Sequence, residues 1–337
     1  MLLPYLYRVA ARENLSAEDA RQAMLAVLSG EATTAQIAAF LVGLRTKGET
    51  SDELLGFARA MREKVARIDA SVDSEPLLDT CGTGAADGPP TFNISTITAF
   101  VVAGAGVRVA KHGNRSLSSQ CGSADVLEAL GIDLSISREQ IGRAIREVGI
   151  GFLFAPALHP AMKYAQPARL ELKMRTVFNL LGPLTNPAGA KRQLIGAPSP
   201  HAAELMAQAL AGLEPERAFV VHGSDGLDEV TTTGSTIVFE VVGRQVTPLT
   251  WRPADFGVAL ANIADLSGGD PVRNRDIAIA VLQGERGPRR DIVLVNAAAA
   301  LLAAGPATDL RAGMRLAAHS IDTGAAWKKV EQLAHFS

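Results

Sequence analysis

Residues 77–131 constrain the fold of this chain more than any other stretch, because they contain the same strand, loop and helix order twice. In the first copy an apolar pair, Leu77 and Leu78, precedes a glycine-rich turn, a polar stretch and a run of helical character. In the second, residues 107–110 form the apolar run, a basic loop follows, and Ser123 begins another helical run. Later segments continue this alternation, which predicts an α/β fold with a mostly parallel central sheet flanked by helices.

Both loops are suited to binding an anion. The start of a helix offers unpaired backbone N–H groups and the positive end of its dipole, and glycines let a phosphate approach the main chain. In a parallel sheet, such loops border one crevice at the carboxyl ends of the strands. The pair therefore predicts a ligand with two phosphate groups. A P-loop is excluded because no Gly-Lys-Thr or Gly-Lys-Ser follows the glycines, and a dinucleotide fingerprint is disfavoured because Asp87 occupies its third glycine position.

Composition narrows the partners that can be expected. The chain has 337 residues, of which 47% are hydrophobic and 20% charged, so a substantial core is expected. Its net charge of -2 argues against a general binder of nucleic acid or of anionic membranes. Cys81 and Cys121 lack the spacing of a zinc site and are expected to be reduced thiols. With no signal-peptide pattern at its amino terminus and no apolar run of about 20 residues, the protein is expected in the cytoplasm.

Residues 1–70 are predicted to be wholly helical, with three amphipathic helices of which the third extends to Ile68. Their core would be small, so this part is expected to pack on the main domain or on another subunit. The domain division predicted for the chain is a helical domain of residues 1–72 plus roughly 166–187, and an α/β domain of residues 73–165 plus 188–337. Residues 244–257 are expected to be irregular.

Three groups outside the anion loops could carry chemistry. Asp228 and Glu229 follow an apolar run, and in a glycine-containing loop two adjacent acids can share one ion, for which Mg²⁺ is the natural choice. A solvated turn is the alternative interpretation of these acids. Arg169 could bind a substrate carboxylate or form a structural ion pair. His112, in the basic loop, could accept a proton or could simply orient its neighbours.

The chain closely resembles the anthranilate phosphoribosyltransferases. The resemblance rests on Gly82-Thr83-Gly84, on Thr-Phe-Asn-Ile-Ser-Thr at 91–96, on Lys-His-Gly-Asn-Arg at 111–115, and on Asp228-Glu229, and it extends over nearly the whole chain. It implies transfer of phosphoribosyl from phosphoribosyl pyrophosphate to the amino group of anthranilate in tryptophan biosynthesis, with Mg²⁺ as cofactor. It also implies a homodimer paired through the helical domains. The chain departs from the family at residues 85–90, where Ala-Ala-Asp-Gly-Pro-Pro lengthens and stiffens the first loop.

The resemblance also implies a role for individual residues. Phosphoribosyl pyrophosphate would be bound by Gly82, Gly84, Asp87, Thr91, Asn93, Ile94, Ser95, Thr96, Lys111, Gly113, Asn114, Arg115, Ser118, Ser119 and Ser123. Anthranilate would be bound by Gly82, His112, Asn114, His159 and Arg169. The metal would be held by Ser95, Asp228 and Glu229, and the groups closest to the chemistry would be Lys111, His112, Asp228 and Glu229.

Two other functions remain open on the sequence. A pyrimidine nucleoside phosphorylase would share the fold, but the stretch Asn93 to Thr96 and the pair Asp228-Glu229 argue against it. A relative of the same fold that binds nucleic acid would need a basic surface, which the overall charge does not support.

Overall fold

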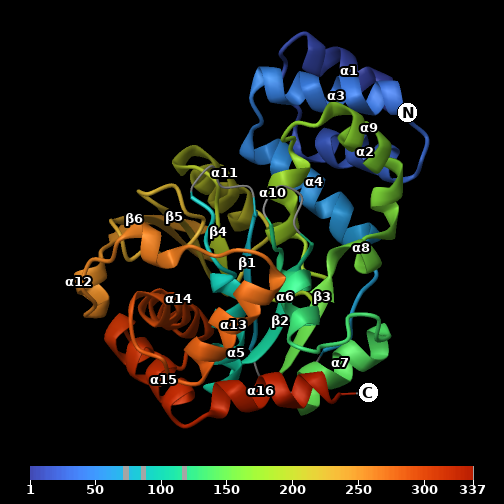
Figure 1. Cartoon of the computed structure of the whole chain (residues 1–337). Coiled ribbons are helices and arrows are strands. Elements are labelled where there is room, and N and C mark those ends of the chain that lie inside the picture. Colours follow the sequence, from blue (N-terminus) through green and yellow to red (C-terminus); the bar gives the residue numbers. More distant parts are fainter. Residues whose placement is uncertain (71–75, 85–88, 116–119, 337) are drawn as a thin grey trace.

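The computed structural model describes residues 1–70, 76–84, 89–115 and 120–336 (Figure 1). Within these, the amino-terminal region contains four helices: α1 (Leu3–Ala10), α2 (Ala17–Leu28), α3 (Thr34–Lys47) and α4 (Ser51–Lys64). Side-chain oxygens of Ser16, Thr33 and Thr50 cap the last three of them. Helix α1 is additional to the three helices predicted from the sequence. The helix expected to reach Ile68 ends at Lys64, because the chain there becomes an extended connector.

A seven-stranded mixed sheet forms the centre of the larger region, and its strands lie in the order β3-β2-β1-β4-β5-β6-β7. The strands are β1 (Leu77–Gly82), β2 (Arg108–Gly113), β3 (Ile150–Phe154), β4 (Arg192–Gly196), β5 (Arg217–Gly223), β6 (Thr236–Val242) and β7 (Gln245–Trp251). Strands β1 to β5 pair in parallel, whereas β6 and β7 are antiparallel additions. The predicted α/β class is thus confirmed, but the expectation of an irregular segment at 244–257 is wrong, because β7 lies there.

Helices cover both faces of the sheet. They are α5 (Ile94–Gly104), α6 (Ser123–Ala129), α7 (Arg138–Glu147), α11 (Pro200–Ala211), α12 (Pro253–Phe256), α13 (Pro271–Leu282), α14 (Pro288–Ala304), α15 (Leu310–Asp322) and α16 (Ala325–Ala334). Alternate strand residues contribute to different cores: Phe219 packs in the cluster with α5 and α14, whereas its neighbour Val220 packs in the cluster with α11 and the amino-terminal helices. No helix in the described part of the chain combines the length and apolar character needed to cross a bilayer.

The segment between β3 and β4 returns to the amino-terminal helices. It forms α8 (Ala155–Leu158), η1 (Pro160–Tyr164), α9 (Gln166–Leu172), α10 (Phe178–Leu181) and η2 (Gly182–Leu184). Figure 1 shows α9 beside α2 and α3, and its Ala168 is buried in the same apolar cluster as Leu41 and Phe57. Where the chain crosses between the two regions, Ala66 N–H donates to Leu158 O (2.9 Å). The crossing segments therefore bond to one another.

Candidate active site

Lys111 joins the first two strands of the site. Its Nζ donates to the Thr80 carbonyl oxygen of β1 (2.6 Å) and to Ser95 Oγ at the start of α5 (3.3 Å). Only 3% of Lys111 is exposed, so the ammonium group has little access to water. The Thr80 hydroxyl in turn donates to the Ser95 carbonyl oxygen (3.2 Å). A buried positive charge is thus fixed between β1, β2 and the start of α5.

The two adjacent acids lie against this group. Asp228 Oδ2 accepts from Gly84 N–H (3.0 Å), and the Ser95 backbone amide forms a hydrogen bond with Glu229. Burial raises the pKa of Asp228, and burial together with the neighbouring Asp228 raises the pKa of Glu229 to about 8. Two carboxylates held together with raised pKa values are stabilised by a shared cation. Their oxygens and the Ser95 hydroxyl make a donor set that fits Mg²⁺.

Two glycines on the strands let the acids approach. A Cβ atom on Gly196 of β4 would lie 1.7 Å from the Asp228 carbonyl oxygen, and one on Gly82 of β1 would lie 2.8 Å from Asp228 Oδ2. Gly82 and Gly196 are register partners in the sheet. The strands therefore present bare backbone where the acid loop crosses them.

The start of α5 has the character of an anion site. Asn93, its N-cap residue, makes no side-chain capping bond, and Ser95 and Thr96 follow in the first turn. Thr96 is 1% exposed, and its Oγ1 has no hydrogen-bond partner among the residues the structure describes. A buried hydroxyl without a partner costs free energy unless a ligand satisfies it. Thr91 precedes this turn and forms an isolated bridge with Ser267.

Ion pairs connect Arg115, just after β2, to α6. Arg115 pairs with Asp125 (2.9 Å) and Glu128 (2.6 Å) of α6, and its guanidinium also lies over the Phe154 ring. Its charge is therefore largely neutralised within the protein, and its side chain is directed toward α6. This geometry disfavours the expected phosphate contact.

Gly113 and Asn114, at the end of β2, lie close to the start of α6. Asn114 is exposed and its carbonyl oxygen accepts from Ala124 N–H (3.2 Å). Gly113 lies against the partly buried Ser123, whose Cβ is 3.1 Å from the position of a Cβ on this glycine. Of the expected ligands, Asp87, Ser118 and Ser119 lie outside the described residues.

His112 and His159 form a buried pair. His112 Nδ1 lies 3.1 Å from the Gly182 carbonyl oxygen, and the Nε2 atoms of the two rings are 3.2 Å apart. Burial lowers the pKa of His112 to about 3 and that of His159 to about 4, so both rings are neutral at pH 7. Because a carbonyl oxygen only accepts, His112 carries its proton on Nδ1 and accepts at Nε2. His159 then donates from Nε2, and its Nδ1 is left as an acceptor.

A second group of possible metal ligands is already used in hydrogen bonds within the protein. Asp79, Cys81 and His112 offer ligand atoms within 4.8 Å of one another, and all three are buried. The carboxylate of Asp79, however, accepts from the His112 backbone N–H (3.0 Å) and from Asn186 Nδ2 (2.7 Å). Both ring nitrogens of His112 are also engaged. This cluster therefore supports β2 at His112 and does not act as a metal centre.

Arg169 lies on α9, on the side of the helical region. Its guanidinium stacks over the Phe178 ring at 5.3 Å, and burial lowers its pKa. No carboxylate or carbonyl group in the described part of the chain pairs with it by a hydrogen bond or ion pair. A partly buried guanidinium without an acid partner is suited to an incoming carboxylate.

Two buried asparagines support the site and were missed in the sequence. Asn296, on α14, accepts from Val230 N–H (2.9 Å) and donates to the Val230 carbonyl oxygen (2.8 Å), next to Glu229. Asn274, on α13, donates to Asn93 Oδ1 (2.9 Å). Each is 2% exposed or less. For Asn296 a lone amide within an apolar helical run was the available signal, whereas Asn274 lies among charged residues and gave none.

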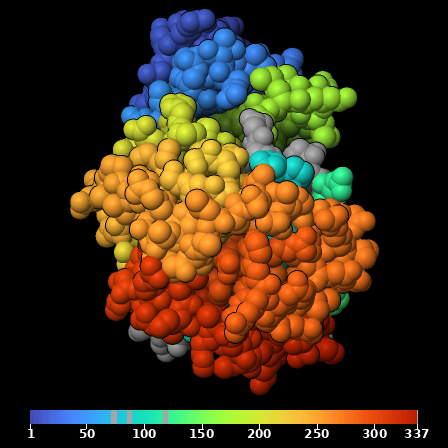
Figure 2. Space-filling model, turned by 60° about the vertical axis from the view of Figure 1, so that its left-hand side comes forward, coloured from blue at the N-terminus to red at the C-terminus, as the bar shows by residue number. Residues whose placement is uncertain are grey.

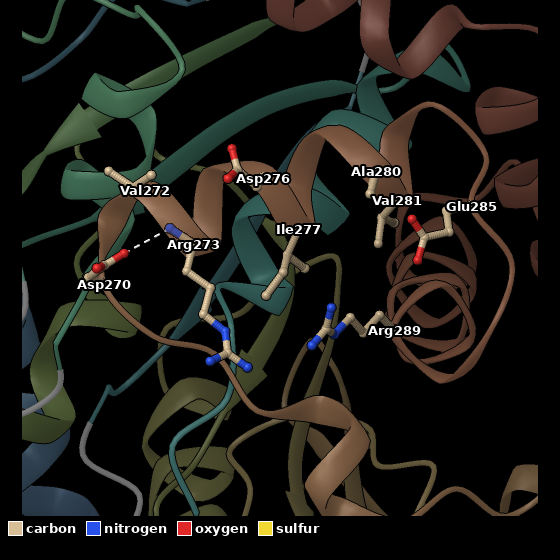
Figure 3. A pocket seen from close by; sticks show the side chains of 9 residues that line it. All are labelled: Asp270, Val272, Arg273, Asp276, Ile277, Ala280, Val281, Glu285 and Arg289. Atoms are coloured by element: carbon tan, nitrogen blue, oxygen red, sulfur yellow. Dashed lines mark hydrogen bonds between the residues drawn. The ribbon is translucent and has the colours of Figure 1, made fainter.

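A hollow of about 490 Å³ lies along α13 (Figure 3). It is lined by Asp270, Val272, Arg273, Asp276, Ile277, Ala280, Val281, Glu285 and Arg289. None of the residues expected to bind substrate or metal is among them. In Figure 2 the cyan segment near residue 90, by contrast, lies at the boundary between the helical region and the α/β region.

Comparison with known proteins agrees with this arrangement. The chain matches the helical bundle domain of a glycosyl transferase family over residues 3–65 and the α/β domain of that family over residues 74–327. The anthranilate phosphoribosyltransferase of Solibacter usitatus is 63% identical over 100% of this chain and 98% of its own length, and that of Moorella thermoacetica is 54% identical over 99% and 97%.

Solved structures give the same result. The anthranilate phosphoribosyltransferase of Thermus thermophilus superposes with a TM-score of 0.91 at 44% identity, covering 98% of each chain. The Saccharomyces cerevisiae enzyme in complex with phosphoribosyl pyrophosphate and Mg gives 0.90 at 28% identity, covering 98% of this chain and 96% of that one. The chain belongs to the anthranilate phosphoribosyltransferase family.

Proposed function

We propose that this protein transfers phosphoribosyl from phosphoribosyl pyrophosphate to the amino group of anthranilate, giving N-(5-phosphoribosyl)anthranilate and pyrophosphate in tryptophan biosynthesis. The observation that carries the proposal is the meeting of Ser95, Lys111 and the pair Asp228-Glu229 at the carboxyl ends of neighbouring strands. The anthranilate phosphoribosyltransferases described above match 100% and 99% of this chain at 63% and 54% identity. One yeast relative binds phosphoribosyl pyrophosphate with Mg.

Ser95, Asp228 and Glu229 would hold Mg²⁺. The ion would neutralise charge on the pyrophosphate as it leaves. Lys111 adds a fixed positive charge beside Ser95, and its short bond to the Thr80 carbonyl keeps it there without reorganisation.

The start of α5 would bind the phosphates of the sugar. Thr96 Oγ1, buried and without a partner in the described segments, would donate to a phosphate oxygen. The other proposed contacts with phosphoribosyl pyrophosphate are Gly82, Gly84, Thr91, Asn93, Ile94, Ser95, Lys111, Gly113, Asn114 and Ser123, together with Asp87, Ser118 and Ser119 outside the described residues. Arg115 would act through its pairs with α6, which hold the second loop in place.

Anthranilate would lie between the second loop and the helical region. Arg169 would pair with its carboxylate, while Gly82, His112, Asn114 and His159 would border the ring and the amino group. The Nδ1 atom of neutral His159 has no hydrogen-bond partner among the described residues, and it is an acceptor that suits an amino N–H. A neutral ring does not compete with Arg169 for the carboxylate.

This arrangement needs no covalent nucleophile. Positive charge develops on the ribose as pyrophosphate leaves the anomeric carbon, and the neutral aromatic amine attacks that carbon. Holding two reactants in line can contribute roughly 7 to 11 kcal/mol, and one well-placed donor about 2.7 to 4 kcal/mol. Together these contributions are of the size that catalysis requires.

We also propose that the domain division is functional. The helical domain would comprise residues 1–72 and roughly 166–187, and the α/β domain residues 73–165 and 188–337. Support comes from Ala168, which packs with the amino-terminal helices, and from the bonds among the crossing segments, such as Ile68 N–H to Pro187 O at 3.1 Å. A hinge there would let Arg169 move toward the sugar and exclude water.

We propose in addition a cytoplasmic homodimer paired through the helical domains. Tyr7 of α1 is 65% exposed and Val42 of α3 is 36% exposed, and a partner subunit packed on the helical domain would cover both side chains. Light scattering of wild type and of Tyr7→Glu would measure the mass. A monomeric wild type would contradict the dimer.

The activity is tested by the fluorescence of anthranilate. We expect the signal to fall when phosphoribosyl pyrophosphate and Mg²⁺ are added together, and to stay constant when either is omitted. Asp228→Asn, which keeps the shape but removes a charge, should raise the Mg²⁺ concentration needed for half-maximal rate. A wild-type protein that leaves the fluorescence unchanged would refute the proposed function.

A further inference from the structure

We propose that Asn274 is a positioning residue for the sugar-phosphate site: it fixes the side-chain amide of Asn93 so that an N–H group is presented to the phosphate. The proposal rests on the proposed function, because Asn93 must face phosphoribosyl pyrophosphate. Asn274 belongs to the first turn of α13 and lies 181 residues after Asn93 in the sequence. Asn274 is 2% exposed, and its hydrogen-bond partners Gly269 and Asn93 come from two separate loops.

A continuous chain of hydrogen bonds passes through both amides. Gly269 N–H donates to Asn274 Oδ1 (2.8 Å), and Asn274 Nδ2 donates to Asn93 Oδ1 (2.9 Å). Asn93 Nδ2 then donates to the Cys121 carbonyl oxygen (3.1 Å). The chain joins the loop before α13, the N-cap of α5 and the loop before α6.

The two terminal hydrogen bonds of this series determine which atom of each side-chain amide is the oxygen and which is the nitrogen. A backbone N–H can only donate, so the atom of Asn274 that faces Gly269 must be its oxygen, and the nitrogen must face Asn93. A carbonyl oxygen can only accept, so the atom of Asn93 that faces Cys121 must be its nitrogen. Both ends thus require the same orientation of Asn93. Inverting either amide would place two donors or two acceptors together.

This orientation leaves Asn93 with a donor for a ligand. One N–H of Nδ2 binds the Cys121 carbonyl, and the other has no acceptor among the residues that the structure describes. Its oxygen is already occupied by Asn274 and by the Cys121 thiol (Sγ to Oδ1, 3.4 Å). A phosphate accepts hydrogen bonds and cannot donate them when ionised, so an inverted Asn93 would repel it.

The helix that carries Asn274 is itself anchored. Asp270 caps α13 by accepting from Arg273 N–H (2.8 Å), and Figure 3 shows both residues with the side chains that border the hollow on this helix. Ile277, one turn further, lines the same hollow and is 5% exposed. It offers a control position on the same helix, since no hydrogen bond connects its side chain to Asn93.

The test compares Asn274→Leu with Ile277→Ala in steady-state kinetics. Leucine has the same branched arrangement of side-chain heavy atoms without polar atoms, and no charge is added near the phosphates. We expect Asn274→Leu to raise the KM for phosphoribosyl pyrophosphate about ten-fold or more, the size of one hydrogen bond to a charged group, with the KM for anthranilate within about two-fold. Ile277→Ala should lower the melting temperature without this selective change.

A double-mutant cycle with Asn93→Ala decides whether Asn274 acts through Asn93. In the Asn93→Ala background, Asn274→Leu should change the KM for phosphoribosyl pyrophosphate less than about two-fold. Equal effects in both backgrounds, an unchanged KM in the single variant, or parallel rises in both KM values would overturn the inference while leaving the proposed function intact. If wild type neither turned over anthranilate nor bound phosphoribosyl pyrophosphate in calorimetry, both would fail.

Discussion

Replacing Gly196 by alanine should displace the acid loop and so test whether its position matters. The added Cβ would lie 1.7 Å from the Asp228 carbonyl oxygen, whereas ordinary contact begins at 3.4 Å. The carbonyl would therefore have to retreat by about 1.7 Å, since it is backbone and cannot rotate away as a side chain does. Gly196 itself has no positive φ, so alanine is compatible with its backbone conformation.

The loop has little freedom to make this retreat. On one side Leu227 is held by Gly223 N–H (2.8 Å) and by Asp225 Oδ1 (3.1 Å). On the other side Asn296 holds both backbone groups of Val230. A misplacement of about 1 Å at a catalytic group can cost roughly 100-fold in rate, and overpacking costs about 1 to 3 kcal/mol of stability.

We therefore expect Gly196→Ala to lower kcat about 100-fold and to raise the Mg²⁺ concentration for half-maximal rate. Gly151→Ala is the matched control, because Gly151 lies in β3 and its Cβ would meet Ile145 Cγ1 at 2.7 Å, far along the sheet order from the acid loop. Anthranilate fluorescence and thermal unfolding would be measured for both. Wild-type kcat and Mg²⁺ dependence in a folded Gly196→Ala protein would refute the reasoning.

Three further predictions follow from single groups. Arg169→Gln should raise the KM for anthranilate about ten-fold with that for phosphoribosyl pyrophosphate unchanged, as read by fluorescence; the reverse pattern would refute its role. Asn296→Leu should raise the Mg²⁺ requirement in a metal titration, because it frees Val230; an unchanged titration would show that the clamp is dispensable. Burial raises the pKa of Asp79 from 3.8 to about 6, so the folded state holds a proton that the unfolded state loses. This stabilisation, at most about 3 kcal/mol, is fully present below the unfolded pKa of 3.8 and is lost as the pH rises through the folded pKa of about 6. Over this range the free energy of urea unfolding should fall more for wild type than for Asp79→Asn, and equal pH slopes for the two proteins would refute the prediction.

Features encoded over short distances could be predicted from the sequence. The glycine-rich turns, the strand order of residues 77–131 and the acids after β5 are local patterns, and they led to the correct fold class and family. Apolar spacing continues to Ile68 and predicts a helix up to that residue, but the helix ends at Lys64. The helix does not continue because Ile68 N–H donates to Pro187 O, so that a partner 119 positions away satisfies the backbone there.

Strand β7 was missed for a related reason. Pro248 interrupts its alternation, and a proline usually argues against a strand. Here β7 is the last strand of the sheet and pairs on one side with β6 alone, so the missing N–H can be tolerated. Edge position depends on the order of all seven strands, which no local pattern contains.

The asparagines show the same limit at the site itself. Apart from Arg290 at the start of α14, the other buried residues of these two helices are apolar, and neither Asn274 nor Asn296 belongs to a known ligand-binding motif. Their importance comes from what they meet: Asn274 meets the N-cap of α5, and Asn296 meets the chain beside Glu229. Because a buried amide without partners is costly, its presence in such a helix is itself evidence of a distant polar contact.

The two halves of the site are supported in the same way. Asn93 and Glu229 come from loops that follow different strands; a helix amide, Asn274, binds the side chain of Asn93, and another, Asn296, binds the backbone of Val230 next to Glu229. Under the proposed function, α13 and α14 would thus fix donors for the phosphates and acceptors for the metal, while Arg169 lies on α9, on the helical side. Closure between the two regions would then bring Arg169 toward the sugar, which is the division expected if closure brings two substrates together.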